Sequence, residues 1–231
     1  MVFLDARLLL IPARSLRGVW TYVTSPHLLN YYLTYLEALA EYSKNFEELS
    51  SKLTELVNNA KSDALGTTAI ANSDRITVGN KVVLNELEFN FKKDDKNMTQ
   101  KLLDVIPNND LKNKVSQAGV VFVSDDVIRE IIKRSLIVQA RVRINYETKT
   151  VAHGALWEEE YLPQFTIMVS GLICSGMRRS LDKINDETVK KELEKLKEPN
   201  DVCRELRNVN SLMLGGKETV GKGLVKLWWY P

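Results

Sequence analysis

The sequence contains very few of the residues that form metal centres and disulfide frameworks. Its 231 residues include two cysteines, Cys174 and Cys203, and two histidines, His27 and His153. Thiols and imidazoles this few and this scattered exclude a zinc site built from those groups. We expect both cysteines to be buried as small hydrophobic residues.

Long apolar runs are also missing. No stretch approaches the roughly 18 to 20 apolar residues that a membrane-spanning helix requires. The first residues, MVFLD, lack the basic start and apolar middle of a secretory signal. These features predict a cytoplasmic protein with no membrane partner.

The chain has no large excess of either charge. Lysine and arginine total 32 against 30 aspartates and glutamates, which gives a net charge of +2. A surface for nucleic acid would therefore depend on local sorting of charge rather than on overall basicity. The 44% of hydrophobic residues is typical of a globular protein, and the length favours one domain over 1–231.

Hydrophobic spacing predicts mixed strands and helices without strict alternation. We expect a buried strand over 2–11 that is closed by Pro12, a helix or helical hairpin over 26–60, a half-buried strand over 87–91 and a solvated loop over 92–97. Another strand at 119–123 precedes a helix capped by Ser124, with acids at its positive end. This order favours an α+β domain over a doubly wound parallel sheet.

The stretch 138–144 predicts a strand whose two faces differ. Apolar residues alternate there with polar ones, and Arg141 and Arg143 lie on the polar face. That face is a candidate surface for RNA or phosphate. The alternative is an ordinary exposed face whose arginines pair with acids across the sheet. A turn at 146–150, a strand at 165–173 and a surface helix at 186–197 follow, the last with Val189, Leu193 and Leu196 facing inward.

A glycine-rich segment, GGKETVGKG at 215–223, resembles a phosphate-binding P-loop. Seven positions from Gly216 fit, but Gly223 stands where a serine or threonine would bind magnesium. A P-loop also opens a helix, whereas both flanks here read as strand. A nucleotide-dependent enzyme is therefore disfavoured. Glycine backbones and loop amides could still cradle an anion, and the alternative is a mobile hairpin with its lysines in solvent.

Three stretches taken together carry a family resemblance. PARSLRG at 12–18 with YVTSP at 22–26, GALWEEEYLP at 154–163 and the glycine loop at 215–223 occur in the order and spacing of one known family. The chain resembles the backbone subunit of type III-B CRISPR Cmr complexes, a branch of the RAMP superfamily, from about residue 2 to Lys226.

The resemblance implies a modified ferredoxin-like (RRM-like) fold. Helical and hairpin insertions would occupy 26–115, and C-terminal strands with the glycine loop would occupy 205–231. The partners that it implies are CRISPR guide RNA, target RNA, other Cmr RAMP subunits and further copies of this chain in a filament. A β-hairpin thumb that wedges into the guide and target duplex would include 145–157. The implied RNA-binding residues are Arg14, Ser15, Arg141, Arg143, Trp157, Gly215, Gly216, Lys217, Gly221, Lys222 and Gly223.

The chain departs from the family pattern at its start. Members begin with a strand, a loop and a helix before the segment matching 2–11, and that loop carries the aspartate needed for metal-dependent RNA cleavage. We therefore expect an N-terminally incomplete fold, with an uncovered sheet edge, and no assigned catalytic residue or metal ligand.

Glu159, Glu160 and Tyr161 match a family segment near the cleavage site and are the remaining catalytic candidates. A divalent ion, Mg²⁺ or Mn²⁺, would be needed if the chain cleaves RNA. Trp157 and Tyr161 could stack on displaced bases, or could be core aromatics beside a strand. The competing functions are thus a structural RNA-binding subunit and an active endoribonuclease.

Overall fold

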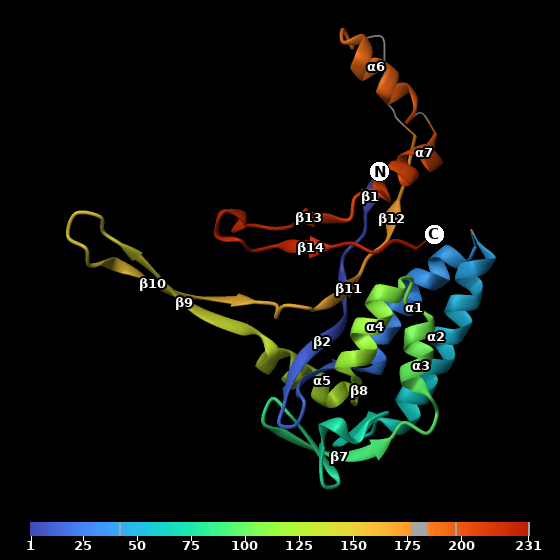
Figure 1. The fold of residues 1–231 in the computed structure, drawn as a ribbon, viewed down its shortest axis with the longest axis vertical. Helices are drawn as coiled ribbons and strands as arrows, with labels where there is room; N and C mark the ends of the chain where they lie inside the picture. Colours follow the sequence, from blue (N-terminus) through green and yellow to red (C-terminus); the bar gives the residue numbers. More distant parts are fainter. Residues whose placement is uncertain (42, 177–183, 197, 231) are drawn as a thin grey trace. The chain divides into compact units, whose positions relative to one another are not determined.

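The computed structural model describes residues 1–41, 43–176, 184–196 and 198–230, and its contacts divide the chain into two compact units (Figure 1). Unit 1 comprises Met1–Ala6, Pro107–Leu111 and Ser170–Pro231, and unit 2 comprises Arg7–Ile106 and Lys112–Val169. Each unit is described by itself. The expectation of one domain over 1–231 stays a prediction.

Unit 2 contains most of the regular structure. Its strands are β2 (Arg7–Ser15), β3 (Val19–Thr24), β4 (Thr68–Ala71), β5 (Thr77–Val78), β6 (Lys81–Leu84), β7 (Leu87–Lys93), β8 (Val120–Phe122), β9 (Ile137–Ile144), β10 (Val151–Tyr161) and β11 (Ile167–Val169). Its helices are α1 (Pro26–Ala40), α2 (Lys44–Asp63), α3 (Met98–Asp104) and α5 (Asp125–Ser135), with a 3₁₀ turn at Asp74–Ile76. Helix α4 (Asn109–Ala118) spans the boundary between the units.

The main sheet of unit 2 has eight strands in the order β11-β2-β3-β8-β4-β7-β6-β5. The β3–β8 and β4–β7 pairs are parallel and the other pairs are antiparallel. An additional pair, Ser15 with Leu84, joins β2 to β6, so six of the strands form a closed ring. Inward-facing residues such as Ile11, Val23 and Val82 are fully buried and form the core with α1 and α5. This mixed arrangement confirms the predicted α+β class.

The helical hairpin predicted near 26–60 is present as α1 and α2. Ser25 caps α1 by accepting a hydrogen bond from Leu28 N, and Pro26 occupies the first helical position. Both residues are strong signals for the start of a helix. The cap residue accepts a hydrogen bond from an otherwise unpaired amide of the first turn, and proline has no amide hydrogen that would need a partner. Helix α2 buries Leu53, Leu56 and Val57 and exposes its charged residues.

Two expectations for strand ends were wrong. Pro12 does not close the first strand, because β2 continues through it to Ser15 and pairs with β3, placing Pro12 opposite Tyr22. The expected loop at 92–97 begins inside β7, and its Asp94 is buried. The Asp94 carboxylate accepts hydrogen bonds from Met98 N and Thr99 N, both at 2.8 Å, and so satisfies the first turn of α3.

The strand at 119–123 and the helix after it are confirmed as β8 and α5. Ser124 is the N-cap residue, but its hydroxyl donates to Gly66 O at 3.0 Å and does not cap α5. Asp125 accepts a hydrogen bond of 2.8 Å from His27 N in the first turn of α1. These contacts fix the starts of α1 and α5 against neighbouring segments.

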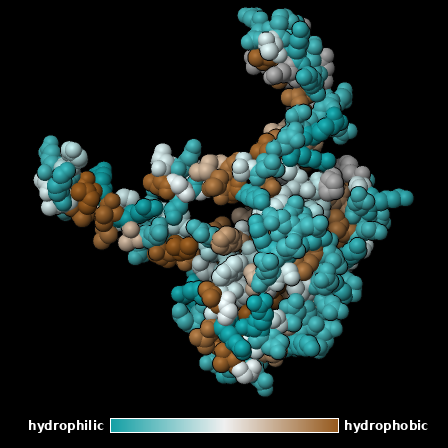
Figure 2. Space-filling model, viewed as in Figure 1, coloured by the Kyte–Doolittle hydropathy of each residue, from teal (hydrophilic) through white to brown (hydrophobic). Residues whose placement is uncertain are grey.

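Among the described residues, strands β9 and β10 pair only with each other and form a long two-stranded ribbon, here called the arm (Ile137–Tyr161; Figure 1). Its strand, turn and alternation were predicted. The apolar face of the arm, with Val138, Val142 and Ile144, has no covering layer among the described residues of unit 2. Figure 2 shows hydrophobic residues on the surface of the arm. On the apolar face Val138, Val142, Ile144, Val151 and Leu156 are exposed, and elsewhere on the arm so are Ile137, Tyr146 and Trp157.

Unit 1 is built from short elements. Strand β1 (Val2–Phe3) pairs with β12 (Leu172–Ile173), and β13 (Ser211–Met213) pairs with β14 (Leu224–Lys226). Its helices are α6 (Glu187–Glu194) and α7 (Pro199–Leu206), with a 3₁₀ turn at Glu218–Val220. The single strand predicted at 165–173 is two strands, β11 and β12, in different units. Helix α6 confirms the predicted surface helix, but its Val189 is exposed rather than inward-facing.

The cysteine prediction was wrong. Cys174 and Cys203 are half-buried and form a disulfide with a Cα–Cα distance of 5.9 Å. The bond links the residue after β12 to the middle of α7. Small apolar character suits a buried thiol, but the sequence offers no sign that a separation of 29 residues would be bridged.

Candidate nucleic-acid interface

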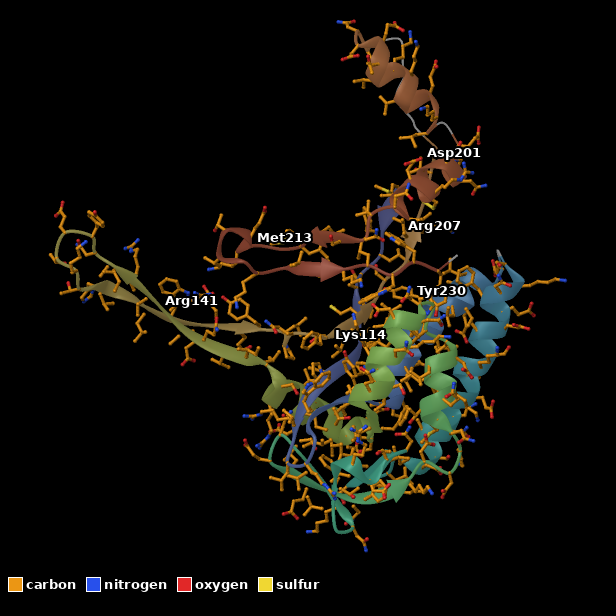
Figure 3. All side chains as sticks on the ribbon, in the orientation of Figure 1. Lys114, Arg141, Asp201, Arg207, Met213 and Tyr230 are labelled. Atoms are coloured by element: carbon orange, nitrogen blue, oxygen red, sulfur yellow. A yellow bond between two sulfur atoms is a disulfide. The ribbon has the colours of Figure 1, made fainter. Side chains whose placement is uncertain are left out.

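The arm brings four of the predicted site residues onto one face. In the β9–β10 register, Arg141 lies opposite Trp157, Gln139 opposite Glu159, and Ile137 opposite Tyr161. Side chains two residues apart on a strand share a face, so Trp157, Glu159 and Tyr161 line up and Arg141 reaches them from the neighbouring strand. Figure 3 labels Arg141 on the arm. The sequence identified these four residues as candidates, but it did not predict that they would lie together on one face.

The Glu159 carboxylate is the centre of this group. It accepts a hydrogen bond of 2.8 Å from Trp157 Nε1 and a short one from the Tyr161 hydroxyl. Arg141 Nε lies 3.3 Å from the same carboxylate, and Arg141 Nη2 donates to the Tyr161 hydroxyl at 3.2 Å. The four side chains form one connected network across the two strands. We call them the Arg141–Glu159 cluster.

The network keeps Arg141 charged. The pKa of Arg141 is raised above its ordinary value, chiefly by the hydrogen bond to Tyr161 and also by the Glu159 carboxylate. For Arg141, therefore, the alternative of a pair with an acid across the sheet holds in the free protein. Arg143 is exposed and has no ion-pair partner among the residues that the structure describes. Its charge is available to a phosphate.

The carboxylates of the arm do not fit a divalent metal ion. Glu159 and Glu160 are adjacent on β10 and point to opposite faces, and Glu159 is already engaged by two hydrogen-bond donors and by its ion pair with Arg141. Within the described ranges, no group of three or more histidines, cysteines, aspartates and glutamates could hold a metal ion. Hard cations need several oxygen ligands that converge on one point. No cleavage step can be derived from these residues.

Arg14 and Ser15 lie at the end of β2 in different surroundings. The Arg14 side chain is exposed and its Nη2 lies 3.2 Å from a Glu86 carboxylate oxygen. Ser15 is buried, and its hydroxyl donates to Arg17 O at 2.6 Å. Arg14 is therefore placed to meet a ligand, whereas Ser15 closes the turn between β2 and β3. Their predicted contacts with RNA stay predictions.

The glycine loop joins two strands, β13 and β14, as the sequence indicated (Figure 3, where Met213 marks β13). Gly215, Gly221 and Gly223 have φ values of +83°, +73° and +83°, which glycine adopts without strain. At Gly223 a Cβ atom would lie 2.1 Å from Leu214 O. That position requires glycine both for its backbone angle and for the close approach of the other strand.

The loop does not offer an anion a set of free backbone amides. Val220 N and Lys222 N both donate to Lys217 O, and Gly221 N donates to Glu218 O. Those amides are satisfied inside the loop and cannot also point at a phosphate. Any anion site here would depend on the ammonium groups of Lys217, which is exposed, and Lys222, which is half-buried. The predicted phosphate contacts of Gly215, Gly216, Gly221 and Gly223 remain untested.

Sequence reasoning missed an aromatic pair in unit 2, formed by the half-buried Trp20 and the exposed Phe165. The rings of Trp20 and Phe165 are stacked, with centroids 5.8 Å apart and planes inclined by 9°. Trp20 also contacts the ring of Tyr22 edge to face. A signal was available, since Phe165 follows Pro163 in a turn-like setting where a large apolar side chain is unusual. The two residues are more than a hundred positions apart, so their pairing is visible only in the fold.

Comparison with known proteins places the chain in a family. The model of the RAMP superfamily matches residues 2–226. The CRISPR system Cmr endoribonuclease Cmr4 of Pyrococcus furiosus is 36% identical over 228 residues, which cover 96% of this chain and 66% of that protein. The CRISPR system CMR subunit Cmr4 of Saccharolobus solfataricus is 30% identical and is matched over 98% of this chain and 70% of its own length.

Solved structures agree with the sequence matches. A chain of a type III-B Cmr-beta complex bound to cognate target RNA superposes with a TM-score of 0.68 at 28% identity, over 97% of this chain and 68% of that one. Oligomeric Cmr4 from Pyrococcus furiosus gives a TM-score of 0.60 at 31% identity, over 96% and 69%. The chain spans about two thirds of the length of its relatives. It belongs to the RAMP superfamily and, within that superfamily, to the Cmr4 family.

Proposed function

We propose that this protein is a guide-RNA-binding backbone subunit of a type III-B CRISPR Cmr ribonucleoprotein that targets complementary RNA in antiviral defence. The observation that carries the proposal is the match to Cmr4 proteins over nearly the whole chain, in both sequence and fold. One solved relative is in a complex bound to target RNA and another is oligomeric. The partners proposed are accordingly guide RNA, target RNA, other Cmr subunits and further copies of this chain.

The residues of the arm support RNA as the ligand. A two-stranded ribbon that is exposed on both faces offers Trp157 to a base and Arg143 to a phosphate. Lys217 and Lys222 in the glycine loop add positive charge. Among the described residues no helix is long and apolar enough to cross a membrane. We place the complex in the cytoplasm.

The first experiment is to purify the tagged protein from its host and to sequence the RNA that accompanies it. RNAs with a constant repeat-derived 5′ handle, together with other RAMP subunits, support the proposal. Recovery of the protein without such RNA contradicts it. A second experiment uses the purified chain and fluorescent single-stranded RNA. Affinity should fall with salt, because phosphate contacts release counterions.

The lysines of the glycine loop can be tested in the same assay. We expect Lys217→Ala and Lys222→Ala to weaken RNA binding without changing the thermal unfolding. Lys52→Ala is the matched control, since Lys52 is an exposed lysine of α2. Equal RNA affinity for the parent and the loop variants would remove these lysines from the interface.

A second candidate function is cleavage of target RNA. It is favoured by the name of the Pyrococcus furiosus relative, an endoribonuclease, and by the Glu159 and Tyr161 pair on the arm. The described carboxylates do not fit a metal ion, so any metal-dependent cut would need a group supplied from elsewhere. Target RNA incubated with the assembled complex and Mg²⁺ or Mn²⁺ distinguishes the two functions. Cuts at regular intervals that are lost in Glu159→Gln would establish cleavage.

A further inference from the structure

Phe165, which stacks on Trp20, lies in a turn at a backbone φ angle that is unfavourable for phenylalanine. Pro163 to Thr166 form the turn, with Thr166 N donating to Pro163 O at 3.3 Å. Phe165 is its third residue and has φ = +69°. The third residue of a type II turn has positive φ and is usually glycine. A large side chain at positive φ is an outlier. The residue is nevertheless 67% exposed.

Neighbouring groups hold Phe165 in this conformation. The buried Tyr22 side chain donates its hydroxyl proton to Phe165 O at 3.0 Å, and the flat face of Trp20 supports the ring. Burial gives the ring little of its stabilisation, because most of it faces water. Glycine would adopt the same backbone without strain. A strained residue that is fixed by its surroundings and exposes an aromatic ring indicates a binding role.

A groove adjoins the aromatic pair. It has a volume of about 390 Å³, within the range of small-molecule sites, and Trp20 and Pro163 are in its wall. Arg14 and Arg134 also line it, together with Asn85 and Ser135. The wall thus combines an indole ring with two guanidinium groups. Aromatic rings accept stacked bases, and guanidinium groups accept phosphates.

Glu86 pairs with both arginines of the groove in the free protein. Its carboxylate lies 3.2 Å from Arg14 Nη2 and 3.8 Å from Arg134 Nη1. Both ion pairs are exposed, and exposed pairs of this kind are weak. Arg134 is also paired with Glu130 at 2.8 Å. A phosphate can therefore replace Glu86 between the arginines.

From these observations we propose that Phe165, Trp20, Arg14 and Arg134 form a binding site for one unstacked nucleotide of single-stranded RNA. The base stacks on the exposed ring of Phe165, which Trp20 supports, and the phosphate pairs with Arg14 and Arg134 in place of Glu86. The site lies in unit 2, in a groove that includes Ile137 at the start of the arm, and it rests on the proposed RNA-binding function.

The test uses the full chain and a short single-stranded RNA that carries 2-aminopurine, whose fluorescence is quenched by stacking. Phe165→Gly removes the ring and keeps the backbone angle, so the turn survives. Base stacking on an aromatic side chain predicts a loss of RNA affinity of about 5- to 150-fold. Phe165→Tyr is the matched control and should retain both affinity and quenching. Val19→Gly is a second control, because Val19 is exposed at positive φ but does not line the groove.

The charges of the groove give an independent test. Arg134→Gln should weaken RNA binding, and Glu86→Gln should strengthen it by removing the carboxylate that competes with phosphate. Opposite shifts support the site. Unchanged affinity and quenching in Phe165→Gly, while the parent binds RNA, would overturn it.

Two other outcomes are separated by the same measurements. Failure of the parent chain to bind RNA at any salt concentration would contradict the proposed function itself, not only this site. Light scattering reports whether Phe165→Gly changes self-association. A change in assembly with unchanged RNA affinity would assign the aromatic pair to a contact between copies of the chain and overturn the nucleotide site.

Discussion

Arg141 and Glu159 form an ion pair of 3.3 Å across the two strands of the arm, with Tyr161 bound to both. The arm therefore presents a neutral pair at one point and an uncompensated arginine, Arg143, two residues further along the same face of β9. The sequence alone makes the two arginines look equivalent. Their surroundings in the fold make them different.

This difference predicts unequal contributions to RNA binding. Arg143→Gln should reduce RNA affinity about 5- to 10-fold and lower the salt slope by about 0.7, the value for one phosphate of a single strand. The double variant Arg141→Gln with Glu159→Gln removes a neutral pair and should bind within about twofold of the parent. Fluorescence anisotropy at several salt concentrations measures both quantities.

Single variants of the pair complete the comparison. Glu159→Gln alone should strengthen binding because it leaves the charge of Arg141 uncompensated. A double variant that loses as much affinity as Arg143→Gln would show that Arg141 contacts phosphate in the complex despite its partner.

The glycine loop gives a matched pair of substitutions. Gly223→Ala would place a Cβ atom 2.1 Å from Leu214 O at φ = +83°, so the β13–β14 hairpin should open at a cost of about 1 to 3 kcal/mol. Gly216→Ala meets nothing within 4 Å and should leave the hairpin unchanged. The readout is hydrogen exchange of Leu214 N–H, which donates to Gly223 O at 2.8 Å. Equal protection in both variants would contradict this account of Gly223.

Local signals predicted much of this fold. Ser25-Pro26 marked the start of α1, and the alternation around Arg141 marked β9, because caps, proline and period-two patterns act within a few residues. What failed depends on distant partners. The alternation in β9 marked an apolar face, but it could not show that this face would stay exposed among the described residues of unit 2. The hydrophobic pattern of a strand indicates which of its faces could be buried, but not whether another element packs on that face.

For the candidate site, too, the sequence predicted the residues but not the contacts between them. Residue types on the arm could be chosen from sequence, since Arg141, Trp157 and Glu159 lie in motifs. Their network could not, because it depends on the register between β9 and β10. The Trp20–Phe165 pair was missed altogether, because β2, β3 and β11 bring the two rings together across the sheet.

The disulfide predicts a redox-dependent change in unit 1. Closing a loop of 29 residues limits the unfolded chain and is worth about 3 to 4 kcal/mol on the loop-entropy estimate. The state of Cys174 and Cys203 should depend on the redox conditions around the protein, since thiols in the cytoplasm are usually kept reduced outside hyperthermophiles. We expect trypsin to cut near α7, at Arg204 or Arg207, faster in Cys203→Ser than in the oxidised parent.

Reductant supplies the control for that prediction. The parent treated with a dithiol, which is oxidised as the disulfide is reduced, should be cut at the rate of the variant, whose own rate should not change. Identical cleavage of the oxidised and reduced parent would show that the disulfide does not restrain α7.

The burial of the Tyr22 phenol, which donates a hydrogen bond to Phe165 O, predicts a loss of stability at high pH. Burial raises the pKa of the Tyr22 phenol to about 12 from a value of 10.0 in the unfolded chain. Between these values the unfolded state releases the proton before the folded state does. The stabilisation is therefore complete below pH 10 and is lost as pH rises to 12, by about 2 to 3 kcal/mol in all.

The Tyr22→Phe variant has no phenol proton to lose. It also lacks the hydrogen bond to Phe165 O, so its free energy of unfolding at pH 8 should be about 1 kcal/mol lower than that of the parent. Urea unfolding of both proteins between pH 8 and 12 measures the difference, and the other tyrosines cancel in it. A difference in stability that does not change with pH would mean that Tyr22 is not shielded from solvent in the way the fold requires.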